Sequence, residues 1–157
     1  MYPFPLVPDD FDVPEVLETE RLRLRPLTIH DVVKDFAAVM ESEDRLREEF
    51  EPDNDWPSGL TLEQDLIDLG WHQREFQERS SFAFTVVDLD ESCVLGCMYI
   101  YPTKKPGYDA DISMWVRDSQ VDSGLEEHLF ETVRTWIEEK WPFVKPNYPG
   151  KSVSFED

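Results

Sequence analysis

Hydrophobic residues recur with two periods along this chain, and each period predicts a different element. Alternation at every second position is typical of a half-buried strand. It marks residues 21–25, where leucines alternate with arginines, and residues 108–117, with Ile112, Met114 and Val116 on one face. Two apolar runs, 82–88 and 93–102, are separated by the turn residues LDES and predict an antiparallel hairpin.

Helical spacing of apolar residues predicts three main helices, at about 28–41, 61–79 and 123–140. Thr28 with Asp31, and Thr61 with Gln64, are polar pairs three residues apart that favour a helix start. Pro142 ends the third helix. A short helix is expected at about 45–50, ahead of an acidic loop that contains Pro52 and Pro57.

The order of these elements is strand, two helices, three strands, helix, and a last extended segment at 143–155. Helices between strands require a crossover and hence at least one parallel pair. We therefore predict an α+β fold with a mixed, mostly antiparallel sheet of about five strands, flanked by three main helices. Residues 1–16 contain four prolines and predict an extended arm, followed by a single domain at 17–157.

The composition is strongly acidic, with 35 Asp and Glu against 15 Lys and Arg, a net charge of −20 over 157 residues. Such a surface repels phosphate backbones and anionic lipids, so we expect neither nucleic acid nor membrane as a partner. It favours cationic or amine-bearing ligands, although solubility or a salty cytoplasm would also explain it. The start has no signal-like segment, so a cytoplasmic location is expected. The three His and two Cys show no ligand spacing, so no metal site is expected.

Three segments resemble the GCN5-related N-acetyltransferase (GNAT) superfamily, particularly its ribosomal-protein alanine acetyltransferase branch: LETERLRLRPLTIHDV (17–32), VLGCMYIYP (94–102) and ADISMWVRDSQVDSGLEEHLF (110–130). They follow the family order over roughly residues 17–140. The resemblance implies acetyl transfer from acetyl-CoA to a small-molecule or peptide amine. An alternative is a catalytically inactive GNAT-fold module that binds another ligand or a protein.

The resemblance also implies where the cofactor would bind. The backbone of the strand containing Met114 and Val116 would bind the pantetheine arm, and the next loop would hold the pyrophosphate through a pattern Q/R-x-x-G-x-G/A. Free amides and the positive end of a helix dipole suit an anion there. The expected residues of this cradle are those that surround its first glycine: Gln120, Ser123, Gly124 and Leu125.

The pattern departs from the family at two positions. Val121 stands at the Gln or Arg position, where Gln120 lies one residue early, and Glu126 stands at the final Gly or Ala. Acidic residues crowd the same stretch. At an effective dielectric near 20 and ~5 Å, each carboxylate–phosphate pair costs about 3 kcal/mol. The alternative is that the acids at 126 and 127 only stabilise the first turn of the helix.

For catalysis, Asp111 matches the acid that family members often place on this strand as base, and Asp109 is its neighbour on the same face. The alternative is that Asp109 and Asp111 are ordinary solvent-facing acids on a half-buried strand. Trp56 and Asp55, in the loop 53–59, would suit a cationic amine, and the alternative for Trp56 is a packing role.

The resemblance ends before the family's last helix and strands. A domain truncated after the fifth strand leaves an open sheet edge, to be covered by the arm or by a homodimer.

Overall fold

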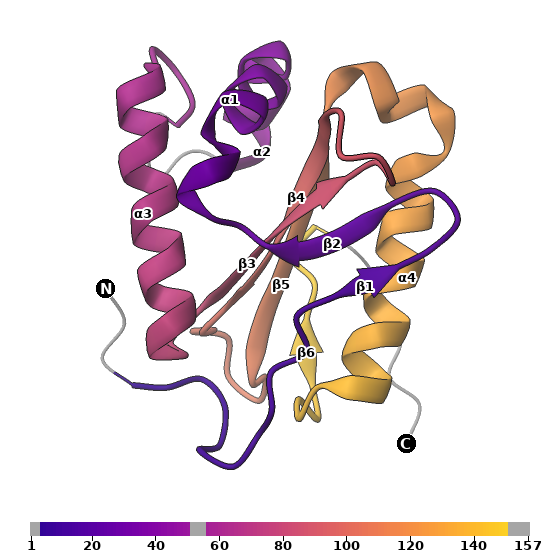
Figure 1. Cartoon of the computed structure of the whole chain (residues 1–157). Coiled ribbons are helices and arrows are strands. Elements are labelled where there is room, and N and C mark those ends of the chain that lie inside the picture. Colours follow the sequence, from indigo (N-terminus) through magenta and orange to yellow (C-terminus); the bar gives the residue numbers. More distant parts are fainter. Residues whose placement is uncertain (1–3, 51–55, 151–157) are drawn as a thin grey trace.

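A sheet with the strand order β1-β2-β3-β4-β5-β6 organises the chain in a computed structural model that describes residues 4–50 and 56–150. The strands are β1 (Leu17–Glu18), β2 (Arg23–Pro26), β3 (Phe82–Val87), β4 (Val94–Tyr101), β5 (Ala110–Val116) and β6 (Pro146–Asn147). The α-helices are α1 (Val32–Glu41), α2 (Glu43–Phe50), α3 (Leu62–Glu78) and α4 (Leu125–Lys140), with 3-10 helices η1 (Ile29–Asp31) and η2 (Asp118–Ser123). Figure 1 shows α1, α2 and α3 on one side of the sheet and α4 on the other.

The pairing of the strands is antiparallel from β1 to β5, and β3 and β4 form the predicted hairpin. At the far edge, β5 pairs with β6 in parallel over only two residue pairs, Ala110 with Pro146 and Asp111 with Asn147. The predicted mixed, mostly antiparallel α+β fold is thus confirmed, parallel pair included. It has one more strand than the approximate five expected.

The extra strand comes from the N-terminal segment, which is a hairpin and not one continuous strand. Leu17 pairs with Leu24 across a tight turn. The Thr19 hydroxyl accepts hydrogen bonds from the amides of Arg21 (3.1 Å) and Leu22 (3.3 Å). Such side-chain-to-backbone bonds are a common way for threonine to make a turn.

Alternation along β4 and β5 divides the buried residues into two cores. One core lies between the sheet and α4 and includes Phe84, Ile112, Leu129 and Trp136. The other lies under α1, α2 and α3 and includes Val39, Leu46, Leu69 and Trp115. Adjacent β5 residues therefore face opposite layers, which decides how the side chains of the candidate site are distributed.

The N-terminal segment runs along the α4-side core and the end of α3. The amide of Leu6 donates to the carbonyl of Arg79 (2.7 Å), and the Arg79 guanidinium donates to the carbonyls of Pro8 (2.6 Å) and Phe11 (2.7 Å). The Phe11 ring lies 5.5 Å from that of Trp141.

None of the helices in the described ranges has the length and apolar character needed to cross a membrane.

A pair of carboxyl groups is buried between α1 and α3. Asp35 is 3% exposed and Asp65 is 2% exposed, and the Cys97 thiol donates to Asp35 Oδ1 at 3.5 Å. Burial raises the pKa of Asp35 well above its usual range, and the nearby charge of Asp65 raises it further. Burial also raises the pKa of Asp65. Because both groups disfavour ionisation, the pair retains a proton at pH values where exposed carboxyls have lost theirs.

This pair predicts a stability that falls as the pH rises. The pKa of Asp35 is raised in the folded state. Its protonated carboxyl therefore contributes fully to stability below about pH 4, and this contribution is lost as the pH rises towards the folded-state pKa. Asp35→Asn removes an ionisable group from the pair, so the free energy of unfolding should increase by roughly 1–3 kcal/mol at pH 8 and little at pH 4. Urea unfolding at both pH values measures this. The exposed control Asp10→Asn should have no effect, and a loss of stability at pH 8 in Asp35→Asn would contradict the prediction.

Candidate functional site

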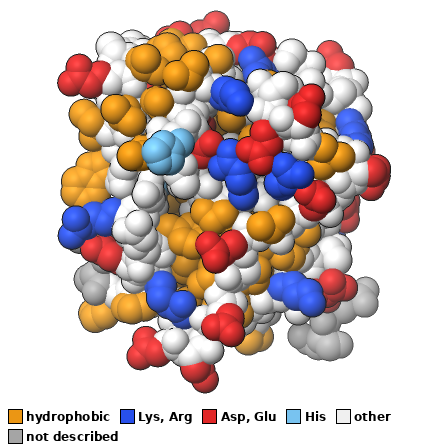
Figure 2. All heavy atoms as spheres, viewed as in Figure 1, with side chains coloured by type: hydrophobic (Ala, Val, Ile, Leu, Met, Phe, Trp, Pro, Cys, Tyr) orange, Lys and Arg blue, Asp and Glu red, His pale blue; other side chains and the backbone are white. Residues whose placement is uncertain are grey.

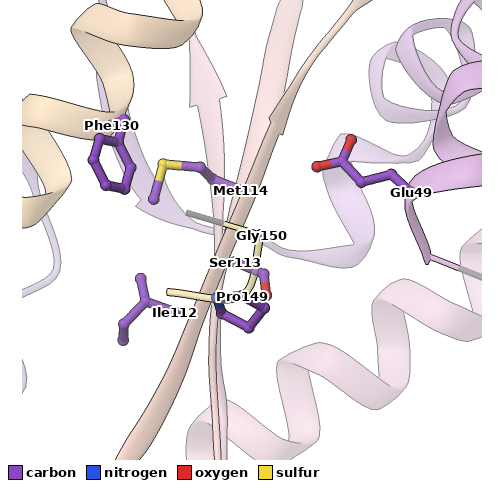
Figure 3. Close-up of a pocket in the computed structure, with 7 residues that line it drawn as sticks. All are labelled: Glu49, Ile112, Ser113, Met114, Phe130, Pro149 and Gly150. Carbon is purple, nitrogen blue, oxygen red and sulfur yellow. The ribbon is translucent and has the colours of Figure 1, made fainter. Parts of the chain in front are cut away.

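The strands β5 and β6 separate after two residues, and a cavity lies where they part. Beyond the pair Asp111–Asn147, β5 continues to Val116 without a partner from β6. The cavity has a volume of about 340 Å³. Its lining residues come from α2, β5, α4 and the segment after β6: Glu49, Ile112, Ser113, Met114, Phe130, Pro149 and Gly150 (Figure 3).

The two sides of this cavity differ in polarity. Ile112 belongs to the α4-side core and Met114 packs against it, whereas Ser113 lies opposite Tyr99, which belongs to the core under α1–α3. Figure 3 shows the Glu49 carboxylate reaching from α2 towards the strand and Phe130 lying on the α4 side. The cavity therefore has an apolar wall from α4 and β5, and a carboxylate and a hydroxyl on the opposite side.

The predicted catalytic acids lie at the fork between the strands. Asp111 is half-buried, and its Oδ1 accepts a hydrogen bond from Asn147 Nδ2 at 2.8 Å. Asp109 is exposed, and its carboxylate accepts from the amides of Val144 (2.6 Å) and Lys145 (3.1 Å). Asp109 thus fixes the backbone that leads into β6, whereas Asp111 is next to Ile112, which lines the cavity. A proton-accepting role for either remains a prediction.

The predicted cradle lies at the start of α4. Gly124 has a φ of 80°, a left-handed conformation that favours glycine, and a Cβ built there meets no atom within 4 Å. The Ser123 hydroxyl accepts from the Leu125 amide (3.3 Å) and donates to the Gln120 carbonyl (2.7 Å). The loop is thus shaped by its own side chains, and space is open beside Gly124.

In the structure, an arginine that is distant in the sequence contacts the predicted cradle. Arg21, in the turn between β1 and β2, donates from Nη2 to the Ser123 carbonyl at 3.2 Å. Val121, which stands where the family pattern has Gln or Arg, packs against the α4-side core. Arg21 precedes Ser123 by 102 positions, and no local motif indicates such a long-range contact.

Arg117, the basic residue that precedes the cradle, is held by α1. Its Nε and Nη2 donate to the two carboxylate oxygens of Glu41 (2.9 and 3.2 Å), and its Nη1 donates to the Val94 carbonyl (3.0 Å). Glu41 also accepts from the Ser119 amide at 3.1 Å. The hydrogen bonds from Arg117 lower the pKa of Glu41 to about 2. Arg117 is thus neutralised by a carboxylate of the chain itself.

Two further residues of the same region complete this contact. The Ser42 hydroxyl accepts from the Asp118 amide at 2.9 Å. Arg45 donates from Nε to the Asp118 carboxylate at 2.8 Å and from Nη2 to the Val116 carbonyl. We call Glu41, Ser42 and Arg45 the α1–α2 clasp. It fixes the end of β5 and engages the carbonyl of Val116, one of the residues expected to bind the pantetheine.

The predicted substrate residues are only partly described. Trp56 is half-buried and packs against the core under α1–α3, and its bond to Pro57 is cis. Asp55 lies outside the described residues. No cluster of three or more His, Cys, Asp or Glu side chains in residues 4–50 and 56–150 is arranged to hold a metal ion.

The clasp predicts a stability contribution that disappears in acid. The pKa of Glu41 is lowered in the folded state to about 2. Its carboxylate therefore stabilises the fold above the ordinary Glu pKa of about 4.3, and this stabilisation is lost as the pH falls towards 2. Glu41→Gln should therefore lower the free energy of unfolding at pH 7 by about 1 kcal/mol or less, since the pair is partly exposed. It should also speed hydrogen exchange at the Ser119 amide. Thermal unfolding and amide exchange by NMR test this against the exposed control Glu20→Gln, and unchanged Ser119 exchange would argue against the clasp.

Comparison with known proteins gives a match only at the level of structure. No protein-family model matches the sequence, and no curated protein does so significantly. The structure is similar to the ribosomal-protein-S5-alanine acetyltransferase from Vibrio fischeri, with a TM-score of 0.62, 17% identity, and coverage of 80% of this chain and 67% of that one. It is also similar to RimL, the ribosomal L7/L12 alpha-N-protein acetyltransferase, in complex with coenzyme A, with a TM-score of 0.64, 16% identity, and coverage of 78% and 67%.

A third similar structure is the microcin C7 self immunity acetyltransferase MccE in complex with acetyl-CoA and AMP. Its TM-score is 0.61 at 7% identity, with 76% of this chain and 63% of that chain covered. All three are acetyltransferases, and at these identities the likeness concerns the fold. Together with the strand order and the fork between β5 and β6, it shows that this chain has the fold of the GNAT acetyltransferases.

Proposed function

We propose that this protein is an acyl-CoA-dependent N-acyltransferase that moves an acetyl group from acetyl-CoA to an amine. The observation that carries the proposal is the separation of β5 from β6, with a cavity of about 340 Å³ against the unpaired part of β5. An unpaired strand edge offers backbone donors and acceptors to an extended, amide-containing chain such as pantetheine. Two similar structures are complexes with coenzyme A or acetyl-CoA.

The cofactor would lie along β5 with its phosphates at the start of α4. Ser113 and Met114 would border the pantetheine, and Gly124 leaves space for a phosphate near the positive end of the α4 dipole. Arg21 supplies a positive charge beside the Ser123 carbonyl. It opposes the acids in the first turn of α4, Glu126 and Glu127.

The reaction needs a proton acceptor near the acyl group. The amine nitrogen forms a bond to the thioester carbonyl carbon, the carbon–sulfur bond breaks, the ammonium loses a proton and the thiolate gains one. Asp111 lies at the fork, and Glu49 lines the cavity while forming an ion pair with Arg45 at 3.6 Å, so these two carboxylates are the candidate acceptors. Glu49 was missed by sequence reasoning because it follows an uninformative acidic stretch and is placed by the packing of α2.

The acceptor substrate would be a small-molecule or peptide amine. The net charge of −20 attracts cations over long distances, and Glu49, which forms an ion pair with Arg45 at 3.6 Å, places a carboxylate at the cavity. The packing of Trp56 into the core favours a supporting role for its ring over direct binding of the amine. The cytoplasmic location and the exclusion of nucleic acid and membranes remain predictions from composition.

A second function, a GNAT-fold binding module without catalysis, is favoured by the α1–α2 clasp. It engages the Arg117 guanidinium, the Asp118 and Ser119 amides and the Val116 carbonyl. These groups are then less available to a cofactor. Measurement of cofactor binding separates the two functions.

Isothermal titration calorimetry with acetyl-CoA is expected to give a dissociation constant on the order of micromolar. Ser113→Phe places a bulky side chain in the cavity and should weaken binding at least about tenfold, while Thr135→Phe on the exposed face of α4 should not. Circular dichroism checks that both variants fold. Absence of heat up to about millimolar acetyl-CoA would favour the binding module, and equal affinity of Ser113→Phe would remove the cavity from the cofactor site.

Arg21 provides a separate electrostatic test. Arg21→Glu reverses a charge next to the expected phosphates, so acetyl-CoA should bind roughly 3- to 10-fold more weakly at low salt, and less so as salt is added. Lys104→Glu makes the same charge change at an exposed site outside the candidate cradle and should have little effect. Glu127→Gln, in the first turn of α4, should strengthen binding. Equal effects of Arg21→Glu and Lys104→Glu would mean that only net charge matters.

A further inference from the structure

The turn between β1 and β2 lies against the start of α4 (Figure 1). Two polar contacts join them: Thr19 Oγ1 lies 2.9 Å from His128 Nε2, and Arg21 Nη2 donates to the Ser123 carbonyl at 3.2 Å. Leu22, in the same turn, is buried in the α4-side core. The turn is therefore fixed both by side chains at the surface and by the core beneath it.

Arg21 differs from the next two arginines of the hairpin in its partners. Arg23 and Arg25 each form an ion pair with Glu91, at 2.9 and 2.8 Å, and Figure 2 shows such mixed charges gathered over β2. Arg21 is exposed, and within residues 4–50 and 56–150 no carboxylate forms an ion pair with it, although the chain contains 35 Asp and Glu. Its charge is therefore available to an anionic ligand.

The hydrogen bonds of Thr19 determine the position of the proton in its contact with His128. A threonine hydroxyl has one proton to donate and two lone pairs with which to accept. Both lone pairs are used, because the amides of Arg21 (3.1 Å) and Leu22 (3.3 Å) donate to Oγ1. The hydroxyl proton is left for His128 Nε2, which must accept it. An accepting Nε2 requires a neutral imidazole that carries its proton on Nδ1.

This contact holds the turn in the position that presents Arg21 to the loop at Gly124. The amide of His128 donates to the Gly124 carbonyl at 3.1 Å, so His128 lies one turn along α4 from that glycine. Since His128 is neutral in the contact, the positive charge comes from Arg21, and His128 acts through its position. A long side chain loses conformational entropy when it is fixed, so a turn that is already held lowers the cost of placing the guanidinium beside a ligand.

We propose that His128 and Thr19 are positioning residues that hold Arg21 beside the phosphates of the cofactor. The inference rests on the proposed function, because the anion is the diphosphate of acetyl-CoA. It adds a second element, the β1–β2 turn, to the cradle expected around Gly124. It also gives residues 19–22, the part of the family-like segment that closes the hairpin, a role in ligand binding.

A double-mutant cycle on acetyl-CoA affinity tests the positioning. His128→Leu removes the acceptor but not the turn bonds of Thr19, and should weaken binding roughly 2- to 10-fold. Arg21→Gln should have a similar effect, and the double variant should lose little more than either single variant, because both changes remove the same contact. His128→Gln has an amide oxygen that can accept from Thr19, so it should recover most of the affinity. His30→Leu, at an exposed histidine of η1, is the matched control and should bind like the wild type.

Nitrogen NMR of the ligand-free protein at about pH 8 tests the proton position independently of binding. The proton of His128 is expected on Nδ1. Thr19→Val should change the Nε2 signal, whereas Thr19→Ser, which keeps the hydroxyl, should not. A proton on Nε2 overturns the inference.

The binding outcomes separate this inference from the proposed function, with circular dichroism to check that each variant folds. A wild-type chain that fails to bind acetyl-CoA overturns the proposed function, and with it the ligand assigned to Arg21. If the wild type binds, an unchanged affinity of His128→Leu, or additive losses in the double variant with Arg21→Gln, overturns the positioning role alone.

Discussion

The short parallel contact between β5 and β6 determines the architecture around the candidate site. Two residue pairs hold β6 to the sheet, and side-chain bonds reinforce them, from Asn147 to Asp111 and from the backbone before β6 to Asp109. Because the contact is so short, the rest of β5 keeps a free edge, and the cavity exists only where pairing has stopped. The two acids predicted as catalytic are thus also the residues that fix the fork. Any loss of activity on their substitution must be distinguished from a change in the position of β6.

In the predicted cofactor loop at Gly124, attraction of an anion by the helix terminus and by Arg21 opposes repulsion by the nearby carboxylates. Each carboxylate about 5 Å from a phosphate costs about 3 kcal/mol at an effective dielectric of 20, more than the 0.3–1 kcal/mol that a helix terminus gives one charge. In the structure Arg117 is neutralised by Glu41, which leaves Arg21 to oppose the acids of α4. In the proposed cofactor site, Arg21 would supply the positive charge that offsets the nearby carboxylates of a chain whose net charge is −20.

Periodicity predicted most of the fold because hydrophobic burial sets the period of each element. The three main helices and the hairpin lie within a few residues of their predicted bounds, and the Thr61–Gln64 capping box is present in both directions at 3.1 Å. The β1–β2 hairpin was missed because the hydroxyl of Thr19 makes its turn without glycine or proline. At the candidate site, the family resemblance predicted the strand that is β5 and the loop at Gly124 as the cofactor site, and that role stays a prediction. Arg21, Glu41 and Glu49 reach the site through tertiary packing, which leaves no periodic signal in a single sequence.

The buried acids and the exposed hydrophobic residues of α3 have a common physical origin. Asp65 faces Asp35 of α1 across the interior, and this contact fixes the rotation of α3 about its axis. With that rotation, the opposite face must present Ile67 and Trp71 to the outside. Burying carboxyl groups costs free energy unless they are hydrogen-bonded, and exposing Trp and Ile forgoes hydrophobic stabilisation. Leu69 is buried on the same helix and Phe76 packs against the α4-side core, so α3 keeps hydrophobic contacts with its own domain. The buried acids take the remaining inward positions of the helix, and Ile67 and Trp71 are exposed because the inward positions are already filled.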